Sequence, residues 1–576
     1  MIRNSRSEKD EDFFQKEQFL NTKLFSNLRK KFCLDGIWDF HFAENVKENY
    51  QIDKIEFDTV MSVPGCFDAQ DKYRFRRGIG FFRRKIRCHS IIKLAIGGLG
   101  LRGKIYWDRK LVGSSELPYS PINLVFDAGN NEEHELIIAT DNRIDNSPSS
   151  MFQPYYDFYG YGGIYRSVYL SYLPKTWIEY FQLTTLDITD GTIQLKLELD
   201  GNIPKTTSVS IRFDDKFHSQ HKITGATGTL VLKVPDFHLW SPKDPTLHQI
   251  TIDIGHEQVR EYFGIRQIKA EQGKILLNEQ VLKLIGYNRH DCHPQFGNAI
   301  PDSLLLNDLQ MIKDQGCNMI RGSHYPQSEH MLELCDRLGL LVWDESLGWG
   351  NPVAVLQDEE FQRRQYEQTR LMVRNSINHP SIIMWGFLNE AETCKPETKP
   401  FIEKICRLIR EEDESRLITF ATMYGIRDLC FDLIDVISFN TYPGWGSRKS
   451  ETQFFESWEV HKELDALADF IANSPWKDKP VIISEIGAEA LPGDHSGRRW
   501  SEEYQAKLLE TACRHVIAEP RYAGILIWQF CDIQAEENGR FLIRPYGFNN
   551  KGVVDSYRRP KLAWRTIRNL LNDIQN

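Results

Sequence analysis

The pattern of hydrophobic and polar positions changes twice along this chain of 576 residues. Up to about residue 170, short apolar runs alternate with turn residues, as in CLDGIWDFHF at 33–42, SVPGCFD at 62–68 and GKIYWDRKLVG at 103–113. Short runs bounded by turn residues are typical of antiparallel strands packed face to face. We therefore expect a β-sandwich over residues 1–175.

A stricter alternation of apolar and polar residues follows, from about Trp177 to Ile268. It is clearest in TIQLKLELD at 192–200, SVSIRF at 208–213 and TLVLKV at 229–234. Because successive side chains of a strand point to opposite faces of a sheet, this period of two indicates strands with one buried face. Residues 176–270 are therefore predicted to form a second, smaller β-sandwich.

After Ala270, apolar strand-like runs alternate with amphipathic helical stretches to the end of the sequence, for example at 304–316 and 359–377. This order is typical of a (β/α)8 TIM barrel, which we predict over residues 271–576. The eight expected strands are 284–288, 319–323, 340–345, 382–390, 417–422, 436–440, 481–486 and 525–530.

Charge and cysteine content narrow the setting in which the protein works. The formal net charge is −9 and the pI is about 6.0, whereas nucleic acids and anionic membranes bind basic surfaces. Residues 1–19 contain no apolar stretch that resembles a secretory signal or a membrane anchor, so we expect a cytoplasmic protein. The 11 cysteines are scattered and form no CxxC pair, which favours reduced thiols over disulfides or a zinc site.

Two glutamates stand where a barrel enzyme places its catalytic groups, at the carboxyl ends of strands. Glu390 ends the fourth expected strand in WGFLNE, and Glu485 lies near the end of the seventh in IISE. Hydrolysis of a glycosidic bond requires one carboxyl group as proton donor and a second that attacks the sugar or activates water. The alternative reading is that each glutamate is a buried ion-pair partner or a solvated strand end. The preceding Asn389 favours the catalytic reading of Glu390.

Several motifs carry a family resemblance, in the same order along the chain. NRHDCHP (288–294), IRGSHYP (320–326), NHPSIIMWGFLNE (378–390) and VIISEIG (481–487) closely resemble motifs of glycoside hydrolase family 2, which contains β-galactosidases, β-mannosidases and β-glucuronidases. GIWDF, YGYGGIYR, LWSP and FGIR resemble its amino-terminal jelly-roll and immunoglobulin-like β-sandwich domains. The resemblance implies a retaining glycosidase without a cofactor, in which Glu390 is the acid/base, Glu485 the nucleophile and Asn389 the partner of the sugar 2-hydroxyl.

The segment GFNNKGVVD at 547–555 bears on the sugar, because Asn549 and Lys551 resemble the Asn-x-Lys element of β-glucuronidases. In that element both side chains contact the sugar carboxylate, and an ammonium beside an amide donor suits a group that is ionised at neutral pH. Taken without its position after the last barrel strand, the pattern would more simply be a surface loop with a solvated lysine. Arg544 is expected to add a second cation, although it stands one residue further from Asn549 than the pattern of that family leads us to expect.

Four more residues resemble sugar-contacting positions of the family. Asp157 in YYDFYGYGG is expected to project from the jelly-roll domain toward the sugar hydroxyls, and His324, Tyr442 and Trp528 are expected in the pocket wall. Two of them have a structural alternative: Trp528 could belong to the barrel core, and His324 could be a strand-end histidine whose hydrogen bonds are made within the protein.

The sequence departs from the family pattern at two places. Gly446 stands where the glucuronidase pattern has a tyrosine four residues after Tyr442, which leaves glucuronide and galacturonide as alternatives. DESLGWG (344–350) lacks the Glu and His that bind metal in β-galactosidases, so no metal site is expected. His290 and His293 are three residues apart, but their loop and the lack of a third ligand favour a structural role. The segment after Glu345 is short, which predicts an open pocket that accepts large aglycones.

These observations favour an exo-acting β-glucuronidase that binds a small-molecule or glycan β-uronide. A β-galacturonidase with the same carboxylate-binding residues is the first alternative, and a β-galactosidase the second, disfavoured by Lys551. A sugar-binding protein without catalysis is the third, disfavoured because both glutamates are present. The family resemblance also implies a dimer or a tetramer.

Overall fold

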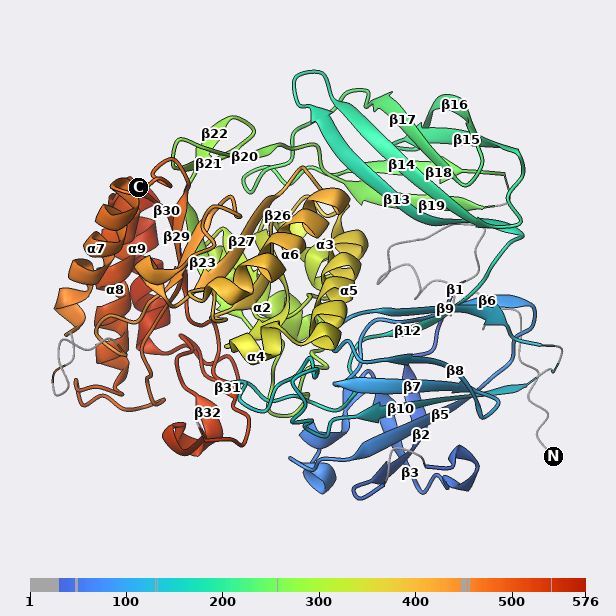
Figure 1. Cartoon of the computed structure of the whole chain (residues 1–576), viewed down its shortest axis with the longest axis horizontal. Helices are drawn as coiled ribbons and strands as arrows, with labels where there is room; N and C mark the ends of the chain where they lie inside the picture. Colours follow the sequence, from blue (N-terminus) through green and yellow to red (C-terminus); the bar gives the residue numbers. More distant parts are fainter. Residues whose placement is uncertain are drawn as a thin grey trace, which may run out of the picture.

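The structure is a computed structural model. It describes residues 31–575 except 47–49, 130, 132, 256, 447–452, 454–455 and 540. Two β-sandwiches lie beside a helix-covered barrel, the first at the lower right and the second at the upper right of Figure 1. The predicted architecture of amino-terminal β-sandwiches and a TIM barrel is confirmed. All eleven cysteines lie within the described residues as free thiols.

The first sandwich consists of a four-stranded and a six-stranded antiparallel sheet, with strand orders β1-β12-β6-β9 and β3-β2-β5-β10-β7-β8. Their facing sides bury Trp38, Phe40, Phe82, Leu94 and Ile138, which form one apolar core. The strands are β1 Lys31–Cys33, β2 Gly36–Ala43, β3 Thr59–Val63, β5 Ile79–Ile86, β6 Ile91–Ile96, β7 Arg102–Trp107, β8 Lys110–Ser115, β9 Ile122–Asp127, β10 His134–Asp141 and β12 Val168–Tyr172. Two short strands, β4 Gly65–Cys66 and β11 Gly163–Ile164, pair outside these sheets.

The second sandwich shows how the alternating sequence sets the fold. In β14 (Thr192–Gly201), Ile193, Leu195 and Leu197 are buried while Lys196 between them is exposed, as a period of two requires. The two sheets have the orders β13-β14-β17 and β16-β15-β18-β19. The other strands are β13 Thr176–Asp187, β15 Thr206–Phe213, β16 Lys216–Thr224, β17 Thr227–Lys233, β18 His248–Asp253 and β19 Gln258–Phe263.

A three-stranded sheet between the second sandwich and the barrel covers the amino-terminal end of the barrel. Its strands are β20 Ile268–Glu271, β21 Lys274–Leu277 and β22 Gln280–Leu282. Ile275 and Leu277 from this sheet join Leu284, Met319 and Leu341, which open three barrel strands, in one apolar core. Because this end is covered, the opposite end, where the strands finish, is the open end.

The barrel closes through eight parallel strands in chain order. They are β23 Leu284–Arg289, β24 Met319–Gly322, β25 Leu341–Trp349, β26 Ile382–Asn389, β27 Leu417–Thr422, β28 Ile437–Asn440, β29 Val481–Ile486 and β30 Tyr522–Ile527. All eight expected strands are present, and two bounds differ notably. β25 continues four residues beyond the expected end at 345, and β30 begins and ends three residues before the expected 525–530.

Helices surround the barrel, and three of them begin with a side-chain cap. The side chains of Ser328, Asp358 and Ser501 accept backbone N–H bonds at the starts of α3, α5 and α8, which satisfies a donor that the first turn leaves free. The helices are α2 Asp302–Asp314, α3 Glu329–Leu338, α4 Val353–Leu356, α5 Glu359–Ser376, α6 Lys399–Glu412, α7 Val460–Ala472, α8 Glu502–Ala518 and α9 Leu562–Gln575. Among the described residues, no helix has the length and apolarity needed to cross a membrane.

The first sandwich reaches the open end of the barrel through its loops. Arg77 Nη2 donates to Glu536 Oε2 at 2.6 Å, beyond the last barrel strand. Arg166 Nη2 donates to the carbonyl oxygen of Pro326 at 2.7 Å, after β24. Asn538 Nδ2, also beyond the last strand, donates to the carbonyl oxygens of Pro154 and Tyr156 at 3.1 and 2.9 Å, which holds the loop that contains Asp157 against this end of the barrel.

Candidate active site

The two candidate glutamates lie at the carboxyl ends of β26 and β29, as the sequence predicted. Glu390 follows the last residue of β26, and its backbone N–H donates to the carbonyl oxygen of Ala421 in β27 at 2.8 Å. Leu388 and Glu390 have φ angles of 56° and 53°, an uncommon region for residues other than glycine. This costly backbone bend at the end of a barrel strand is typical of functional sites, where the surrounding structure holds it in place.

Asn440, at the end of β28, connects Glu390, the candidate general acid, to the preceding Asn389. Its Nδ2 donates to Glu390 Oε1 at 3.0 Å and to Asn389 Oδ1 at 2.9 Å. Its Oδ1 accepts the hydroxyl of Ser484 at 2.8 Å. The side chain of Asn440 is thus fixed from both ends and orients the carboxyl group of Glu390.

Arg321, in β24, is the central cation of the site. Its Nη1 donates to Glu485 Oε1 at 2.7 Å, and its Nε and Nη2 donate to the two carboxylate oxygens of Glu345 at 2.9 and 3.0 Å. Nη2 also donates to Asn389 Oδ1 at 2.9 Å. Arg321 and Glu345 are completely buried, so one guanidinium serves as the shared cation of two carboxylates away from bulk solvent.

The charge of Glu485 is set by opposing effects. Burial raises its pKa, and the Arg321 guanidinium acts against this by favouring the ionised form. Tyr442 acts in the same direction, because its hydroxyl donates to Glu485 Oε2 at 2.6 Å. Burial also raises the pKa of Tyr442 well above its ordinary value, so this hydroxyl keeps its proton. The sequence assigned Tyr442 only to the pocket wall, whereas the structure brings it into contact with the candidate nucleophile.

His324 and Trp528 lie together beside this network. Their rings stack with centroids 5.0 Å apart, and His324 Nδ1 lies 3.1 Å from Glu345 Oε1. Burial, followed by the charge of Arg321, lowers the pKa of His324 well below its ordinary value, so the ring is neutral at physiological pH. Trp528 comes directly after β30 rather than within it, and is therefore at the barrel mouth. Gly487 has no side chain here because a Cβ would lie 2.1 Å from the carbonyl oxygen of Trp528.

Asn389 Nδ2 and His324 Nε2 are among the buried polar atoms of this region that make no hydrogen bond to any residue that the structure describes. An unsatisfied buried polar atom is costly, so native proteins rarely leave one without a reason. Both atoms belong to residues that contact the network around Glu485. They are suited to hydrogen-bond the hydroxyl groups of a bound sugar.

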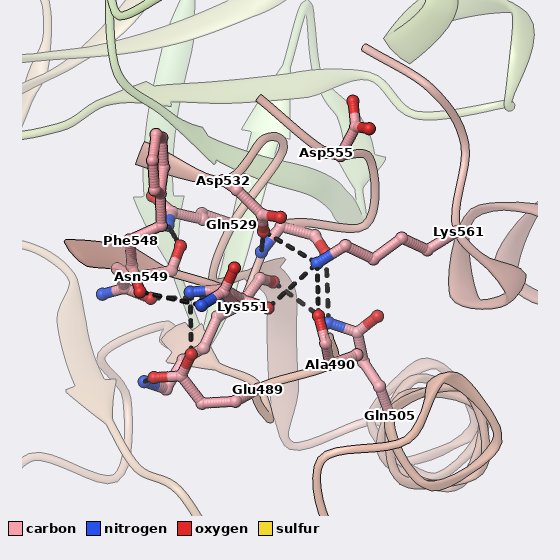
Figure 2. Close-up of polar contacts among 12 residues, drawn as sticks. Glu489, Ala490, Gln505, Gln529, Asp532, Phe548, Asn549, Lys551, Asp555 and Lys561 are labelled. Atoms are coloured by element: carbon pink, nitrogen blue, oxygen red, sulfur yellow. Dashed lines mark hydrogen bonds and ion pairs between the residues drawn. The ribbon is translucent and has the colours of Figure 1, made fainter. Parts of the chain in front are cut away.

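The residues expected to bind a sugar carboxylate form a second cluster. Asn549 Nδ2 donates to Asp157 Oδ2 at 3.2 Å, and Arg544 Nε donates to Asp157 Oδ1 at 3.2 Å. Figure 2 shows Lys551 beside Glu489, where Lys551 Nζ donates to Glu489 Oε1 at 2.7 Å. Arg544 Nη1 contacts the same oxygen. The structure thus brings Asn549, Lys551, Arg544 and Asp157 together, and adds Glu489.

The carboxylate cluster adjoins the first network. The Lys551 ammonium lies 5.9 Å from the centroid of the Tyr442 ring, and Tyr442 in turn contacts Glu485. A Cβ at Gly487 would lie 3.7 Å from Cδ of Lys551 and would also meet Trp528. The two catalytic candidates and the cations of the second cluster therefore adjoin one another at the mouth of the barrel.

Four residues in contact with these side chains were not singled out from the sequence: Arg321, Glu345, Asn440 and Glu489. Arg321 stands within the motif IRGSHYP and Glu345 within the segment DESLGWG, and Asn440 ends the sixth strand much as Glu390 follows the fourth. Polar residues at the ends of buried strands were therefore the available signal. Glu489 lies in a loop after β29, where no pattern marked it.

Two other sequence features are placed as follows. Gly446 lies in the turn after Tyr442, and its N–H donates to the Tyr442 carbonyl oxygen at 2.8 Å. His290 Nδ1 lies 3.3 Å from the Tyr325 hydroxyl, and His293 Nδ1 accepts the N–H of Gln295 at 3.2 Å. Across the described part of the chain, no three His, Cys, Asp or Glu side chains are grouped so that they could hold a metal ion.

Comparison with protein families agrees with this site. Residues 268–576 match the model described as glycosyl hydrolases family 2, TIM barrel domain, and residues 176–266 match glycosyl hydrolases family 2. The chain belongs to glycosyl hydrolase family 2. The family 2 resemblance inferred from the motifs is thereby confirmed, and the protein is a family 2 glycosidase.

Individual relatives of this family 2 glycosidase are named as uronidases. It is 27% identical to a β-glucuronidase of Streptococcus agalactiae over 94% of this chain and 98% of the relative, and 30% identical to that of Rattus norvegicus over 72% and 64%. Among solved structures, a β-galacturonidase from Eisenbergiella tayi bound to galacturonate is 30% identical, with a TM-score of 0.88 and coverage of 96% and 99%.

Proposed function

We propose that this family 2 glycosidase is a retaining exo-β-uronidase that hydrolyses β-D-glucuronides. The observation that carries the proposal is a pair of cations, the buried Lys551 and the partly buried Arg544, held near Glu485. Glu489 and Asp157 pair with these cations within the protein, and the donors of Lys551 that remain suit a further anion. A neutral sugar would offer these cations only hydroxyl groups, whereas a uronate offers an ionised carboxylate.

Glu390 and Glu485 then divide the chemistry. Glu390 gives its proton to the glycosidic oxygen as Glu485 attacks the anomeric carbon, so that the bond to the aglycone breaks and a covalent glycosyl-enzyme forms. In the second step Glu390 accepts a proton from water, and the hydroxyl oxygen displaces Glu485. Both steps invert the anomeric carbon, so the product retains the β configuration.

Neighbouring residues support these roles. Arg321 and Tyr442 each donate a hydrogen bond to a different oxygen of Glu485, which favours the ionised carboxylate that attack requires. Asn389 Nδ2 has no hydrogen-bond partner among the residues that the structure describes, which supports the proposed hydrogen bond to the sugar 2-hydroxyl. Such bonds strengthen in the transition state of glycoside hydrolysis.

The sugar carboxylate is proposed to accept bonds from Lys551, Asn549 and Arg544. Within the described residues, Lys551 Nζ makes one hydrogen bond, to Glu489, although an ammonium has three donors. The remaining donors suit a carboxylate that enters from the pocket. The side chains of Lys551 and Arg544 are 8% and 9% exposed, against 1% for Glu489, which supports approach from the side opposite Glu489.

A β-galacturonidase is the second candidate, and the relative from Eisenbergiella tayi favours it. Glucuronate and galacturonate differ only in the configuration at C4, so the proposed carboxylate contacts serve both sugars. Gly446, in place of the tyrosine of the glucuronidase pattern, leaves this choice to experiment.

The test is an assay of aryl β-D-glucuronide, β-D-galacturonide and β-D-galactoside with the wild type and Lys551→Ala. We expect hydrolysis of a uronide and a loss of at least about 100-fold in kcat/KM in the variant, since a charge-assisted contact is removed from a buried site. Lys313→Ala is the matched control, because Lys313 Nζ donates to backbone oxygens of Pro242 and Gly339 outside this cluster. Equal uronide turnover by Lys551→Ala and wild type would reject the proposed carboxylate contacts.

Glu485→Gln separates the enzyme from a sugar-binding protein without catalysis. We expect it to bind a uronide and not to hydrolyse it. A wild type that binds uronides without turnover would instead favour the binding protein. On the family resemblance, the protein is proposed to be a dimer or a tetramer. Native mass spectrometry measures this assembly state.

A further inference from the structure

Glu489 is the most deeply buried charged group of the carboxylate-binding cluster. One of its oxygens accepts from Lys551 Nζ at 2.7 Å and from Arg544 Nη1, and the other accepts the backbone N–H of Asn550 at 2.7 Å. Its side chain is 1% exposed. Glu489 therefore contacts both cations, as Figure 2 shows for Lys551, and two of the three donors of Lys551 Nζ have no partner among the described residues.

Charges around the cluster balance when Glu489 is ionised. Asp157 and Glu489 contribute two negative charges, and Arg544 and Lys551 contribute two positive charges. Without Glu489, Lys551 would lie in a buried site beside Arg544, and a second cation disfavours its protonated form. Asp157 would remain, but it contacts Arg544 and Asn549 directly rather than Lys551.

We propose that Glu489 is a positioning residue that keeps Lys551 in its ammonium form and fixes it toward the sugar carboxylate. The inference rests on the proposed uronidase function and deepens it. Burial and Arg544 act to lower the pKa of Lys551, whereas Glu489 acts to raise it. Burial acts to raise the pKa of Glu489. The charges of Lys551 and Arg544 outweigh this effect and hold the pKa of Glu489 below its ordinary value.

Other groups face these two side chains from neighbouring elements. Tyr442, after β28, faces Lys551 with its ring and stays neutral. Asp532, after β30, lies near Glu489, and its carboxylate accepts from Lys561 Nζ at 2.8 Å. Lys561 also donates to the carbonyl oxygen of Asn550 at 3.0 Å. This second ion pair braces the same turn, so the effect of Glu489 has to be measured by substitution at Glu489 itself.

The experiment is calorimetric binding of D-glucuronate and D-galacturonate as a function of pH, with D-glucose as a neutral probe. Free uronates are ionised throughout the range, and binding does not require turnover, so a loss of catalysis does not limit the signal. In the wild type, we expect uronate binding to weaken at alkaline pH as Lys551 loses its proton. In Glu489→Gln, the midpoint of this weakening should move to lower pH by about one unit or more.

Two further variants identify the group that titrates. An arginine does not lose its proton in this range, so Glu489→Gln should not move the midpoint when Lys551 has been changed to Arg. Glu489→Asp keeps the charge on a shorter side chain, and its midpoint should lie between those of the wild type and Glu489→Gln. It also serves as the second test if Glu489→Gln does not fold.

The outcomes separate this inference from the proposed function. A wild type that neither binds nor hydrolyses a uronide overturns both. If the wild type hydrolyses a uronide, but the midpoint of its binding curve is the same in Glu489→Gln or Glu489→Asp, only the role of Glu489 is overturned. If Glu489 were merely structural, its substitution would lower the unfolding temperature and weaken glucose and uronate binding equally at every pH.

Discussion

Tyr442 donates its hydroxyl hydrogen to Oε2 of Glu485 at 2.6 Å, while Arg321 occupies Oε1 at 2.7 Å. In this hydrogen bond a neutral hydroxyl donates to an ionised carboxylate. Hydrogen bonds to charged groups contribute about 1.5 to 3 kcal/mol to stability. The bond from Tyr442 therefore favours the carboxylate before attack, and it must weaken as that oxygen forms or supports the glycosyl bond.

Tyr442→Phe tests this relationship. We expect kcat for an aryl uronide to fall about 10- to 100-fold, because the nucleophile loses one of its two stabilising donors. Steady-state kinetics and thermal unfolding measure the effect. Tyr504→Phe is the control, since the Tyr504 hydroxyl donates to the carbonyl oxygen of Gly444 and does not contact Glu485. Unchanged kcat in Tyr442→Phe would contradict the assignment.

Arg321→Gln should change both stability and the pH profile. The variant leaves Glu345 and Glu485 buried without their cation, which costs about 3 to 5 kcal/mol in the free energy of unfolding. Burial raises the pKa of Glu485 and Arg321 opposes this, so without Arg321 the nucleophile ionises only at higher pH. The acidic limb of kcat/KM should therefore move to higher pH.

Arg289→Gln provides the matched loss of a buried guanidinium. Arg289 pairs with Asp291 and Asp308, and neither contacts Glu485. We expect a comparable loss of stability without a shift of the acidic limb. A similar shift in both variants would mean that general destabilisation, rather than Glu485, controls that limb.

Glu390→Gln should depend on the leaving group. A proton donor matters most when the departing oxygen is basic, and general acid catalysis contributes about 10²- to 10⁴-fold. Hydrolysis of an alkyl or phenyl uronide should fall by that amount, whereas cleavage of a dinitrophenyl uronide should form the glycosyl-enzyme almost normally. Proton NMR of the first product of the wild type should show the β anomer. An α product would contradict the retaining assignment.

Asp344 predicts a pH dependence of stability. Burial raises its pKa to about 7. Because the folded protein then binds a proton that the unfolded chain releases near pH 4, this contribution is present below that pH and is lost as the pH rises to about 7. Asp344→Asn should flatten the stability curve between these limits by up to about 1.4 kcal/mol per pH unit.

Asp413 should behave in the opposite way and serves as the control. Burial alone would raise its pKa, but the Arg416 guanidinium and further hydrogen bonds lower it to about 2. Its contribution is therefore present above about pH 4 and lost toward pH 2. Chemical denaturation of Asp344→Asn and Asp413→Asn at several pH values distinguishes the two contributions. Equal slopes for wild type and Asp344→Asn would refute the prediction for Asp344.

The aglycone side is expected to be open. Only residues 350–352 separate β25 from the short helix α4, so no long segment follows Glu345 over the site. We predict that uronides with large aglycones, or a uronate at the end of a glycan, are hydrolysed with kcat/KM similar to that of an aryl uronide. Turnover restricted to small aryl uronides would contradict this expectation.

The sequence was most informative where a repeating pattern and a strand end coincide. Glu390 and Glu485 were found because each closes an apolar strand of the barrel. The end of β30 was placed three residues late because WQF continues the apolar run after the strand has finished, and periodicity does not distinguish a strand from a buried loop at its end.

The contacts within the site were harder to anticipate. Arg321 meets Glu485, 164 positions along the chain, and Arg544 meets Asp157, 387 positions away. Such pairs depend on the closure of the barrel and on the docking of a sandwich loop, which no local pattern encodes. Glu489 was not anticipated for the same reason, because its role depends on which cations the fold brings into contact with it.

Asp157 has a consequence for how such proteins can be recombined. It comes from the first sandwich, yet its carboxylate contacts Arg544 and Asn549 of the barrel. A chimera that joins this barrel to another amino-terminal half would inherit Glu390 and Glu485 but not this contact. One part of the proposed sugar-binding cluster is therefore supplied by a different module from the two glutamates, and exchanging that module should alter selectivity while the cleavage chemistry persists.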